Sequence, residues 1–153
     1  MPGSPILPPD IERARHASAP VETVVTADES APARARFAIA DVARATVGAA
    51  RLNDVLVAVS EAVTNAVHHA YEGAYGEITI KVWPGSETLG VLVSDEGRGL
   101  DVPALFAEAD RPHPGLGMRL MRTLASDFRI LSPPRDGTSV LLIFRPSRDT
   151  AAA

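Results

Sequence analysis

The strongest pattern in this chain is a run of small apolar residues at helical spacing between Asn53 and Gly73. The apolar positions that share one face of such a helix are Val55, Leu56, Val59, Ala62, Val63, Ala66, Val67 and Ala70. Polar residues, among them Glu61, Asn65 and His68, fall on the opposite face. A repeat of about 3.6 residues predicts an amphipathic helix with one buried side, and Gly73 is its natural end.

Two other segments have helical patterns. The segment 32–47 follows Ser30, a suitable N-cap, starts with a proline in its first turn and ends near Gly48. The segment 115–126 is opened by glycines and is expected to form the third helix. Its apolar residues recur at helical spacing: Leu116, Leu120, Met121 and Leu124.

Short segments with the composition or alternation of strands complete the pattern: 21–25, 77–83, 89–94, 128–131 and 139–144. Turn residues separate the second of these from the third, which predicts a hairpin. The order is strand, helix, helix, strand, strand, helix, strand, strand. It predicts an α+β fold, a two-layer α/β sandwich with a mixed, mostly antiparallel sheet and helices on one face.

The chain has the size and composition of one folded domain. Its 153 residues are 46% hydrophobic, which is enough for a real core. Residues 1–20 hold five of the 13 prolines and no long apolar run, so we expect a flexible N-terminal tail there, and neither a secretion signal nor a membrane span. The folded domain is expected over residues 21–146, followed by a flexible C-terminal tail at 147–153.

Composition removes several function classes. The formal net charge of −4, from 15 basic and 19 acidic residues, gives no sign of a direct nucleic-acid or membrane partner and fits a cytoplasmic protein. The absence of cysteine removes disulfides, thiolate nucleophiles and cysteine-ligated metal sites. The four histidines do not have the spacing of zinc ligands.

Glu61 and Asn65 lie four residues apart, so their side chains sit one above the other on the polar helix face. Asparagine is a mediocre helix former, and a bound partner would justify it there. Its neutral amide oxygen suits Mg²⁺ that also binds phosphate and water. Glu61 would then act as a base toward an attacking hydroxyl, or orient a water. A solvated polar face explains the same two residues.

The sequence Asp95-Glu96-Gly97-Arg98-Gly99 directly follows a predicted strand. Its two glycines let the backbone approach a flat ligand. An ionised Asp95 only accepts hydrogen bonds, so it can bind the exocyclic amine of adenine and discriminate against guanine, which has a carbonyl at that position. A charged turn with flexible glycines explains the segment equally well.

Two further glycine segments border the last helix and the last strand. Gly115 and Gly117 open a helix whose free backbone N–H groups suit a phosphate, and the proline-rich segment 101–114 before them has the length of a lid. Gly137 precedes Thr138, whose hydroxyl can bond a base edge. Taken alone, the first segment is explained by a plain helix start and the second by a turn.

The order of these features is more specific than any one of them. The chain has E-x-x-x-N on a helix, D-x-G-x-G after a strand, G-x-G opening a helix and G-T before a strand. This order resembles the Bergerat ATP-binding fold shared by gyrase, the heat-shock chaperone ATPases, the mismatch-repair ATPases and the sensor histidine kinases. The segment 58–66 (AVSEAVTNA) is similar in particular to the corresponding helix of the anti-sigma-factor serine kinases, and the resemblance covers residues 21–145.

The resemblance implies a role for each matching residue. Asn65 would bind the Mg²⁺ that bridges the phosphates of ATP, Glu61 would be the general base, and Asp95 would bind the adenine amine. Arg111 is the basic residue that matches the phosphate lid. The residues implied around the adenine and the phosphates are Gly97, Gly99, Gly115, Leu116, Gly117 and Thr138.

The function implied by the resemblance is that of an anti-sigma-factor kinase. Such a protein transfers the γ-phosphate of ATP to a serine of an anti-anti-sigma factor and holds a sigma factor inactive. A homodimer is expected by analogy. Two alternatives stay open. One is a binding module that sequesters a regulatory partner in a nucleotide-dependent way without kinase activity, and the other is an ATPase that drives a conformational cycle.

Overall fold

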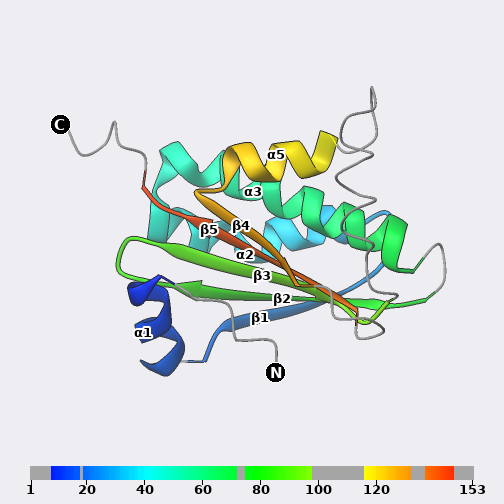
Figure 1. The fold of residues 1–153 in the computed structure, drawn as a ribbon, viewed down its shortest axis with the longest axis horizontal. Helices are drawn as coiled ribbons and strands as arrows, with labels where there is room; N and C mark the ends of the chain where they lie inside the picture. The colour runs from blue at the N-terminus through cyan, green and yellow to red at the C-terminus, as the bar shows by residue number, and fades with distance from the viewer. Residues whose placement is uncertain (1–7, 18, 72–74, 98–115, 132–136, 147–153) are drawn as a thin grey trace.

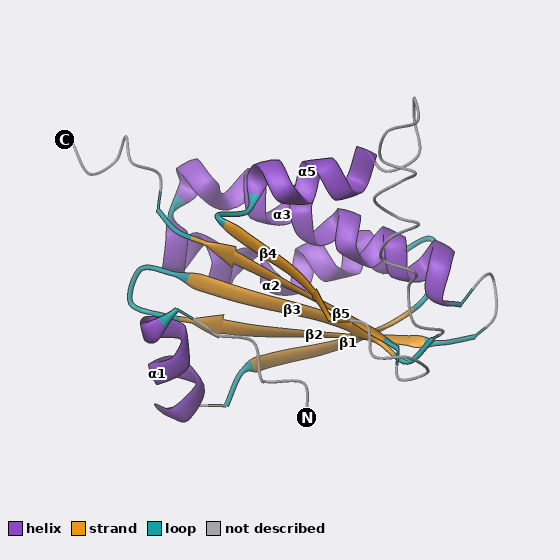
Figure 2. Ribbon diagram, viewed as in Figure 1, coloured by secondary structure: helices purple, strands orange, loops and turns teal. Residues whose placement is uncertain are grey.

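The computed structural model of the chain describes residues 8–17, 19–71, 75–97, 116–131 and 137–146 (Figure 1). In chain order the elements are α1 (Pro9–Ala17), β1 (Val21–Thr26), α2 (Ala31–Val47), α3 (Ala49–Asn65), the π-helix η1 (Ala66–Ala70), β2 (Glu77–Pro84), β3 (Leu89–Asp95), α5 (Leu116–Leu124), β4 (Asp127–Leu131) and β5 (Thr138–Phe144). The strands form one sheet in the order β1-β2-β3-β5-β4, and every neighbouring pair of described strands is antiparallel. Helices α2, α3 and α5 cover one face (Figure 2). The expected two-layer α/β sandwich is confirmed.

The helix-covered face of the sheet carries the main hydrophobic core. The strand register places Ile80 opposite Val93, and both side chains are buried. Helix α3 adds a stripe of buried residues: Val55, Ala58, Val59, Ala62 and Val63. Apart from Ala58, this stripe lies within the apolar face that the helical period predicts. The buried side of the helix is therefore encoded in the spacing of its apolar residues.

The long helix starts and ends at different residues from those predicted. It begins at Ala49 rather than after Asn53, because Gly48 closes α2 and lets α3 start immediately afterwards. The φ angle of Gly48 is +80°, a conformation that favours glycine. The α-helix ends at Asn65, where the chain continues as η1 instead of as further α-helical turns.

Helix α1 packs on the other face of the sheet, opposite to α2, α3 and α5 (Figure 1). Ile11 is completely buried, and a Cβ atom added to Gly90 would lie 3.2 Å from its Cγ2 and 3.6 Å from Ile143 Cδ1. Gly90 pairs with Ile143, and the next residue, Val91, belongs to the helix-covered core. By alternation along the strand, position 90 therefore faces away from that core. The segment Pro9–Ala17 thus forms a packed helix where a flexible tail was expected.

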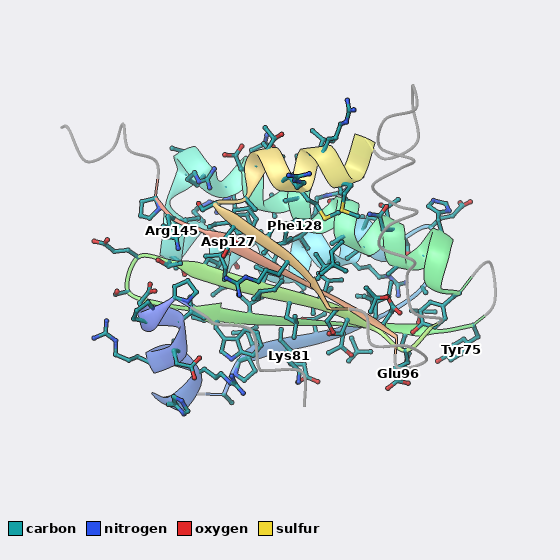
Figure 3. All side chains as sticks on the ribbon, viewed as in Figure 1. Tyr75, Lys81, Glu96, Asp127, Phe128 and Arg145 are labelled. Carbon is teal, nitrogen blue, oxygen red and sulfur yellow. The ribbon has the colours of Figure 1, made fainter. Side chains whose placement is uncertain are left out.

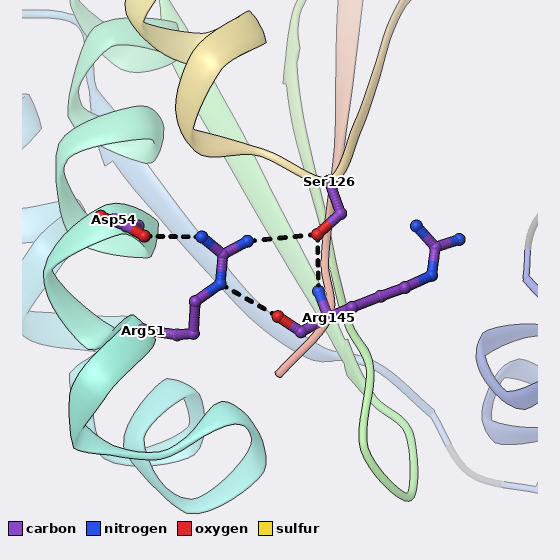
Figure 4. Close-up of polar contacts among 4 residues, drawn as sticks. All are labelled: Arg51, Asp54, Ser126 and Arg145. Atoms are coloured by element: carbon purple, nitrogen blue, oxygen red, sulfur yellow. Dashed lines mark hydrogen bonds and ion pairs between the residues drawn. The ribbon is translucent and has the colours of Figure 1, made fainter. Parts of the chain in front are cut away.

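Arg51 ties the start of α3 to the ends of two strands (Figure 4). Its Nη1 donates to Asp54 Oδ2 at 2.6 Å, its Nε to the carbonyl oxygen of Arg145 at 3.0 Å, and its Nη2 to Ser126 Oγ at 3.1 Å. The same Ser126 oxygen accepts a hydrogen bond from the Arg145 N–H at 2.9 Å. The guanidinium carbon also lies 5.7 Å from the centre of the Phe144 ring. These contacts, which we name the Arg51 clasp, hold α3, β4 and β5 together.

Candidate functional site

The described site residues lie where α3 and β3 end. The π-helix η1, which directly follows α3, contacts β3, and α5 packs along α3 (Figure 1). Two groups of predicted site residues result. The first, on the helices, is Glu61, Asn65 and Gly117, and the second, at the strand ends, is Asp95, Gly97 and Thr138.

Glu61 and Asn65 stand one turn apart on α3, and both are half-buried. Beyond Asn65 the chain widens into η1, and the N–H of Ala66 bonds the carbonyl oxygens of both Ala62 and Val63. Within the described chain the Asn65 side chain makes no capping hydrogen bond. Turns of π-helix are rare in proteins, and those that occur are often found at functional sites. This turn is therefore a sign of function that the sequence pattern did not reveal.

Gly117 lies directly against Glu61. A Cβ atom at position 117 would be 2.5 Å from Glu61 Oε2, closer than real side chains approach, so a larger residue there would require the end of the Glu61 side chain to move. Met118 and Met121 are buried and hold α5 on the core. The first turn of α5 therefore brings backbone N–H groups, which have no partner inside the helix, next to the Glu61 carboxylate.

Asp95, the last residue of β3, is only 9% exposed. Its Oδ1 accepts hydrogen bonds from the backbone N–H groups of Gly97 at 3.0 Å and Thr138 at 3.3 Å. Burial raises the pKa of Asp95, and these two hydrogen bonds oppose the rise. No described residue donates a hydrogen bond to Oδ2. The second carboxylate oxygen can therefore accept a hydrogen bond from a ligand N–H group.

Gly137 brings the last strand against Asp95. Its φ angle is +76°, and a Cβ atom at this position would collide with the carbonyl oxygen of Asp95. Thr138, which is 3% exposed, is the register partner of Asp95 in the β3–β5 pair. Glycine at position 137 is thus required by both the backbone conformation and the close approach. It lets the Thr138 N–H reach the Asp95 carboxylate.

Some predicted site residues cannot be placed. Gly99, Arg111 and Gly115 lie outside the described residues. Leu116 is the first residue of α5, but its side chain is not described. The roles of these four residues stay predictions.

A cavity of about 230 Å³ opens at the same end of the sheet but on its other face. Its lining consists of Glu22, Glu77, Thr79, Lys81, Ser94, Asp95 and Glu96. Ile78 pairs with Asp95 and belongs to the helix-covered core. Because paired residues point to the same face, the Asp95 side chain is directed to the helix side and away from this cavity. The cavity is therefore not part of the candidate site.

Tyr71 connects the two groups of site residues, although the sequence pattern did not single it out. Its hydroxyl donates to the carbonyl oxygen of Glu77 at 2.6 Å and accepts from the N–H of Glu96 at 2.9 Å. Glu96 directly follows Asp95, so Tyr71 supports the turn that carries the carboxylate. An aromatic residue near the end of the predicted helix was the only signal in the sequence, and such residues commonly just pack on a core.

The described residues lack two further features. They contain no group of three or more histidine, aspartate or glutamate residues that could hold a metal ion. Nor does any helix within these residues have both the length and the apolar character that a membrane crossing requires.

Comparison with known proteins gives a match over most of the chain. The family described as the histidine kinase-like ATPase domain matches residues 25–144. Solved structures support the same fold. A blue-light activated histidine kinase of Erythrobacter litoralis has a TM-score of 0.54 and 24% identity, with 67% of this chain and 32% of that chain covered. The histidine kinase domain of the Erythrobacter litoralis enzyme, as a separate structure, has a TM-score of 0.53 and 21% identity, with 93% of the present chain and 70% of that domain's chain covered.

Curated relatives are more similar in sequence. An anti-sigma F factor of Thermoanaerobacter sp. is 34% identical over 93 residues, which cover 57% of this chain and 65% of that protein. An anti-sigma F factor of Clostridium acetobutylicum is 32% identical over 97 residues, or 60% and 68% of the two chains. A serine-protein kinase RsbW of Bacillus cereus is 33% identical over 101 residues, which cover 60% of this chain and 62% of that protein. The chain thus spans between 62% and 68% of the length of these relatives. It belongs to the histidine kinase-like ATPase domain family and, within it, to the anti-sigma-factor kinases.

Proposed function

We propose that this chain is a protein serine kinase of the anti-sigma-factor type, which binds ATP with Mg²⁺ and transfers the γ-phosphate to a partner protein. The observation that carries the proposal is the buried Asp95 carboxylate, with one oxygen bonded by two backbone N–H groups and with no donor among the described residues on the other. The position of Glu61 against the glycine start of α5 gives further support. A group suited to base recognition and a group suited to proton transfer thus occur in one domain.

Asp95 would bind adenine through its free carboxylate oxygen. The exocyclic amine of adenine donates a hydrogen bond, whereas guanine has a carbonyl at that position, so a carboxylate acceptor selects adenine. The N–H groups of Gly97 and Thr138 hold the carboxylate in place, and burial strengthens its hydrogen bonds because water is excluded. Gly97 and Gly99 would leave room for the flat base.

Asn65 would bind Mg²⁺ through its amide oxygen. A hard cation accepts such a neutral oxygen together with phosphate oxygens and waters, and it offsets the negative charge of the phosphates. The Asn65 side chain fits this role because no capping bond within the described residues occupies it. Gly115, Leu116 and Gly117 would donate backbone N–H groups to the phosphates, and Arg111 would add a positive charge.

Glu61 would accept the proton of the attacking serine hydroxyl. As the serine oxygen bonds to the γ-phosphorus, the bond to the β-phosphate oxygen breaks and ADP leaves. Glu61 shares a helix face with Asn65, one turn away, so proton transfer and phosphate binding would take place side by side. Catalysis would come mainly from positioning and charge neutralisation.

The partners are part of the proposal. We expect a sigma factor that the chain holds inactive and an anti-anti-sigma factor that carries the acceptor serine. The names of the relatives, anti-sigma F factor and serine-protein kinase, support both expectations. By analogy with these relatives we expect a cytoplasmic homodimer.

The substitution Glu61→Gln separates nucleotide binding from phosphate transfer. We expect the affinity for Mg-ATP to be retained and the rate of transfer to fall by about 100-fold or more, the usual contribution of a positioned base. Calorimetric titration measures the first quantity, and transfer of labelled γ-phosphate to a purified anti-anti-sigma factor measures the second. Glu87→Gln, at an exposed position between β2 and β3, is the control and should change neither. Transfer at the wild-type rate by Glu61→Gln would remove the kinase proposal.

The name anti-sigma F factor among the relatives favours a second candidate, a nucleotide-dependent binding module without kinase activity. Capture of a sigma factor with and without ATP, with phosphate transfer measured in the same samples, separates the two candidates. ATP-dependent capture without transfer to any anti-anti-sigma factor supports the binding module. Transfer that depends on Glu61 supports the kinase.

A further inference from the structure

Tyr71 lies between the helix group and the strand group of the candidate site. It directly follows η1, and its hydroxyl bonds two separate backbone segments. One bond is donated to the carbonyl oxygen of Glu77, at the start of β2, and the other is accepted from the N–H of Glu96, just after β3. Figure 3 labels Glu96 at this end of the sheet. The hydroxyl therefore links the end of the long helix to two strand ends.

Gly76 holds the Tyr71 ring in place. A Cβ atom at position 76 would collide with the ring, so the ring lies directly against this buried backbone. The Gly76 carbonyl oxygen in turn accepts a hydrogen bond from the N–H of Ala27 at 2.9 Å, just beyond β1. The ring also packs against the hydrophobic core. Contacts on several sides of the ring thus hold its hydroxyl in one position.

The turn that carries Asp95 is held from two directions. The N–H groups of Gly97 and Thr138 bond the carboxylate itself, and Tyr71 bonds the N–H of the next residue, Glu96. A rotation of the peptide unit between Asp95 and Glu96 would break the bond to Tyr71. The tyrosine hydroxyl therefore restricts the direction in which the free oxygen of Asp95 points.

We propose that Tyr71 is a positioning residue for base recognition, which fixes the Asp95 carboxylate relative to the helix that carries Glu61 and Asn65. The inference rests on the proposed contact between Asp95 and adenine. Because α3, η1 and Tyr71 are continuous in the chain, the hydroxyl bond sets the distance between the phosphate side and the base side of the site.

The donor proton of Tyr71 is retained near neutral pH. Burial raises the pKa of the Tyr71 hydroxyl, and the negative charges of Asp95 and Glu96 raise it further, while the two backbone hydrogen bonds oppose the rise. The bond to Glu77 is therefore present throughout the pH range in which nucleotide binding is measured.

The test is the substitution Tyr71→Phe, which keeps the ring and removes the hydroxyl. Wild type and variant are titrated with Mg-ATP and with the Mg complex of purine riboside triphosphate, which lacks the exocyclic amine. We expect the preference of the variant for ATP to fall about fivefold, the effect of one hydrogen bond, with affinity for the amine-free nucleotide unchanged. Tyr75→Phe is the matched control, because Tyr75 is 79% exposed and its hydroxyl lies 3.4 Å from the Glu77 carboxylate. It should keep the wild-type preference.

A second variant perturbs the same contact without removing the hydroxyl. Gly76→Ala places a methyl group against the Tyr71 ring and should lower the ATP preference in the same direction. Thermal unfolding of every variant is measured in parallel. If Tyr71→Phe lowers the melting temperature but keeps the wild-type ratio of the two affinities, the residue is only structural and the inference is wrong. If wild type itself shows no preference for ATP, the adenine contact of Asp95 fails and the inference falls with it.

Discussion

Replacing Arg51 with alanine is expected to destabilise the protein by about 2 kcal/mol, because it removes the centre of the Arg51 clasp. The Arg51 side chain is only 15% exposed, and its guanidinium makes three hydrogen bonds, to Asp54, Ser126 and Arg145. Each bond joins α3 to itself or to the ends of β4 and β5. The loss therefore affects the junction of helix and strands rather than a single side-chain contact.

The magnitude follows from the exposure of the partners. A hydrogen bond contributes about 1 kcal/mol net, and less where water can replace the lost donor, as it can at the exposed residues Ser126 and Arg145. The Asp54 side chain is 31% exposed, so its ion pair is worth about 0.5 kcal/mol after solvent screening. The contact with the Phe144 ring adds about 0.5 kcal/mol. For a chain of 153 residues the total corresponds to a fall in melting temperature of about 4–8 °C.

Urea unfolding followed by circular dichroism measures this difference. Arg145→Ala is the matched control, because Arg145 contributes its backbone to the clasp while its guanidinium points away from the other three residues (Figure 4). It should change the free energy of unfolding by less than about 0.5 kcal/mol. Arg51→Lys should recover only part of the loss, because an ammonium group cannot make the forked contact. Equal effects of Arg51→Ala and Arg145→Ala would refute this account of the clasp.

Two further predictions concern the site and the first helix. Burial raises the pKa of Asp95, so the native state keeps the proton of this carboxyl group at pH values where the unfolded state has lost it. The free energy of unfolding therefore falls as the pH rises from about 4 through the native pKa. Asp95→Asn should therefore gain stability relative to wild type over this range in thermal unfolding at pH 4 to 8, and a pH-independent difference would contradict the burial argument. Ile11→Ala should cost about 2 kcal/mol or more, since Ile11 is completely buried. The exposed Arg15→Ala on the same helix should cost less than about 0.5 kcal/mol, and equal losses in urea unfolding would show that α1 is not anchored by Ile11.

Most of the fold was predictable because its strands and helices carry strong local patterns. The alternation in 77–83 gave β2 to within one residue, since one face of that strand is buried and the other is not. The packing of α1 was not predictable, because it depends on a single apolar anchor, Ile11, meeting Gly90 and Ile143 from strands distant in sequence. The start of α3 was misplaced because Gly48 needed to be recognised as the break between two consecutive helices.

The site was predictable only where its geometry is local. The spacing of Glu61 and Asn65 places both on one helix face, and the position of Asp95 at a strand end follows from the hydrophobic pattern. The support given by Tyr71 was not predictable, because it depends on a π-turn and on the approach of η1 to β3. Similarly, no sequence pattern shows that Gly117 touches Glu61. Contacts of this kind arise from tertiary packing.

The widened turn of η1 also has a practical consequence for protein engineering. A π-turn closes its hydrogen bonds one residue later than an α-turn, so the angle at which Tyr71 leaves the helix depends on every residue after Asn65. A chimera that exchanges this helix with a relative should therefore be joined beyond the tyrosine. A junction inside the turn, or a single deletion there, would rotate the ring away from the strand end and separate the helix group from the strand group of site residues.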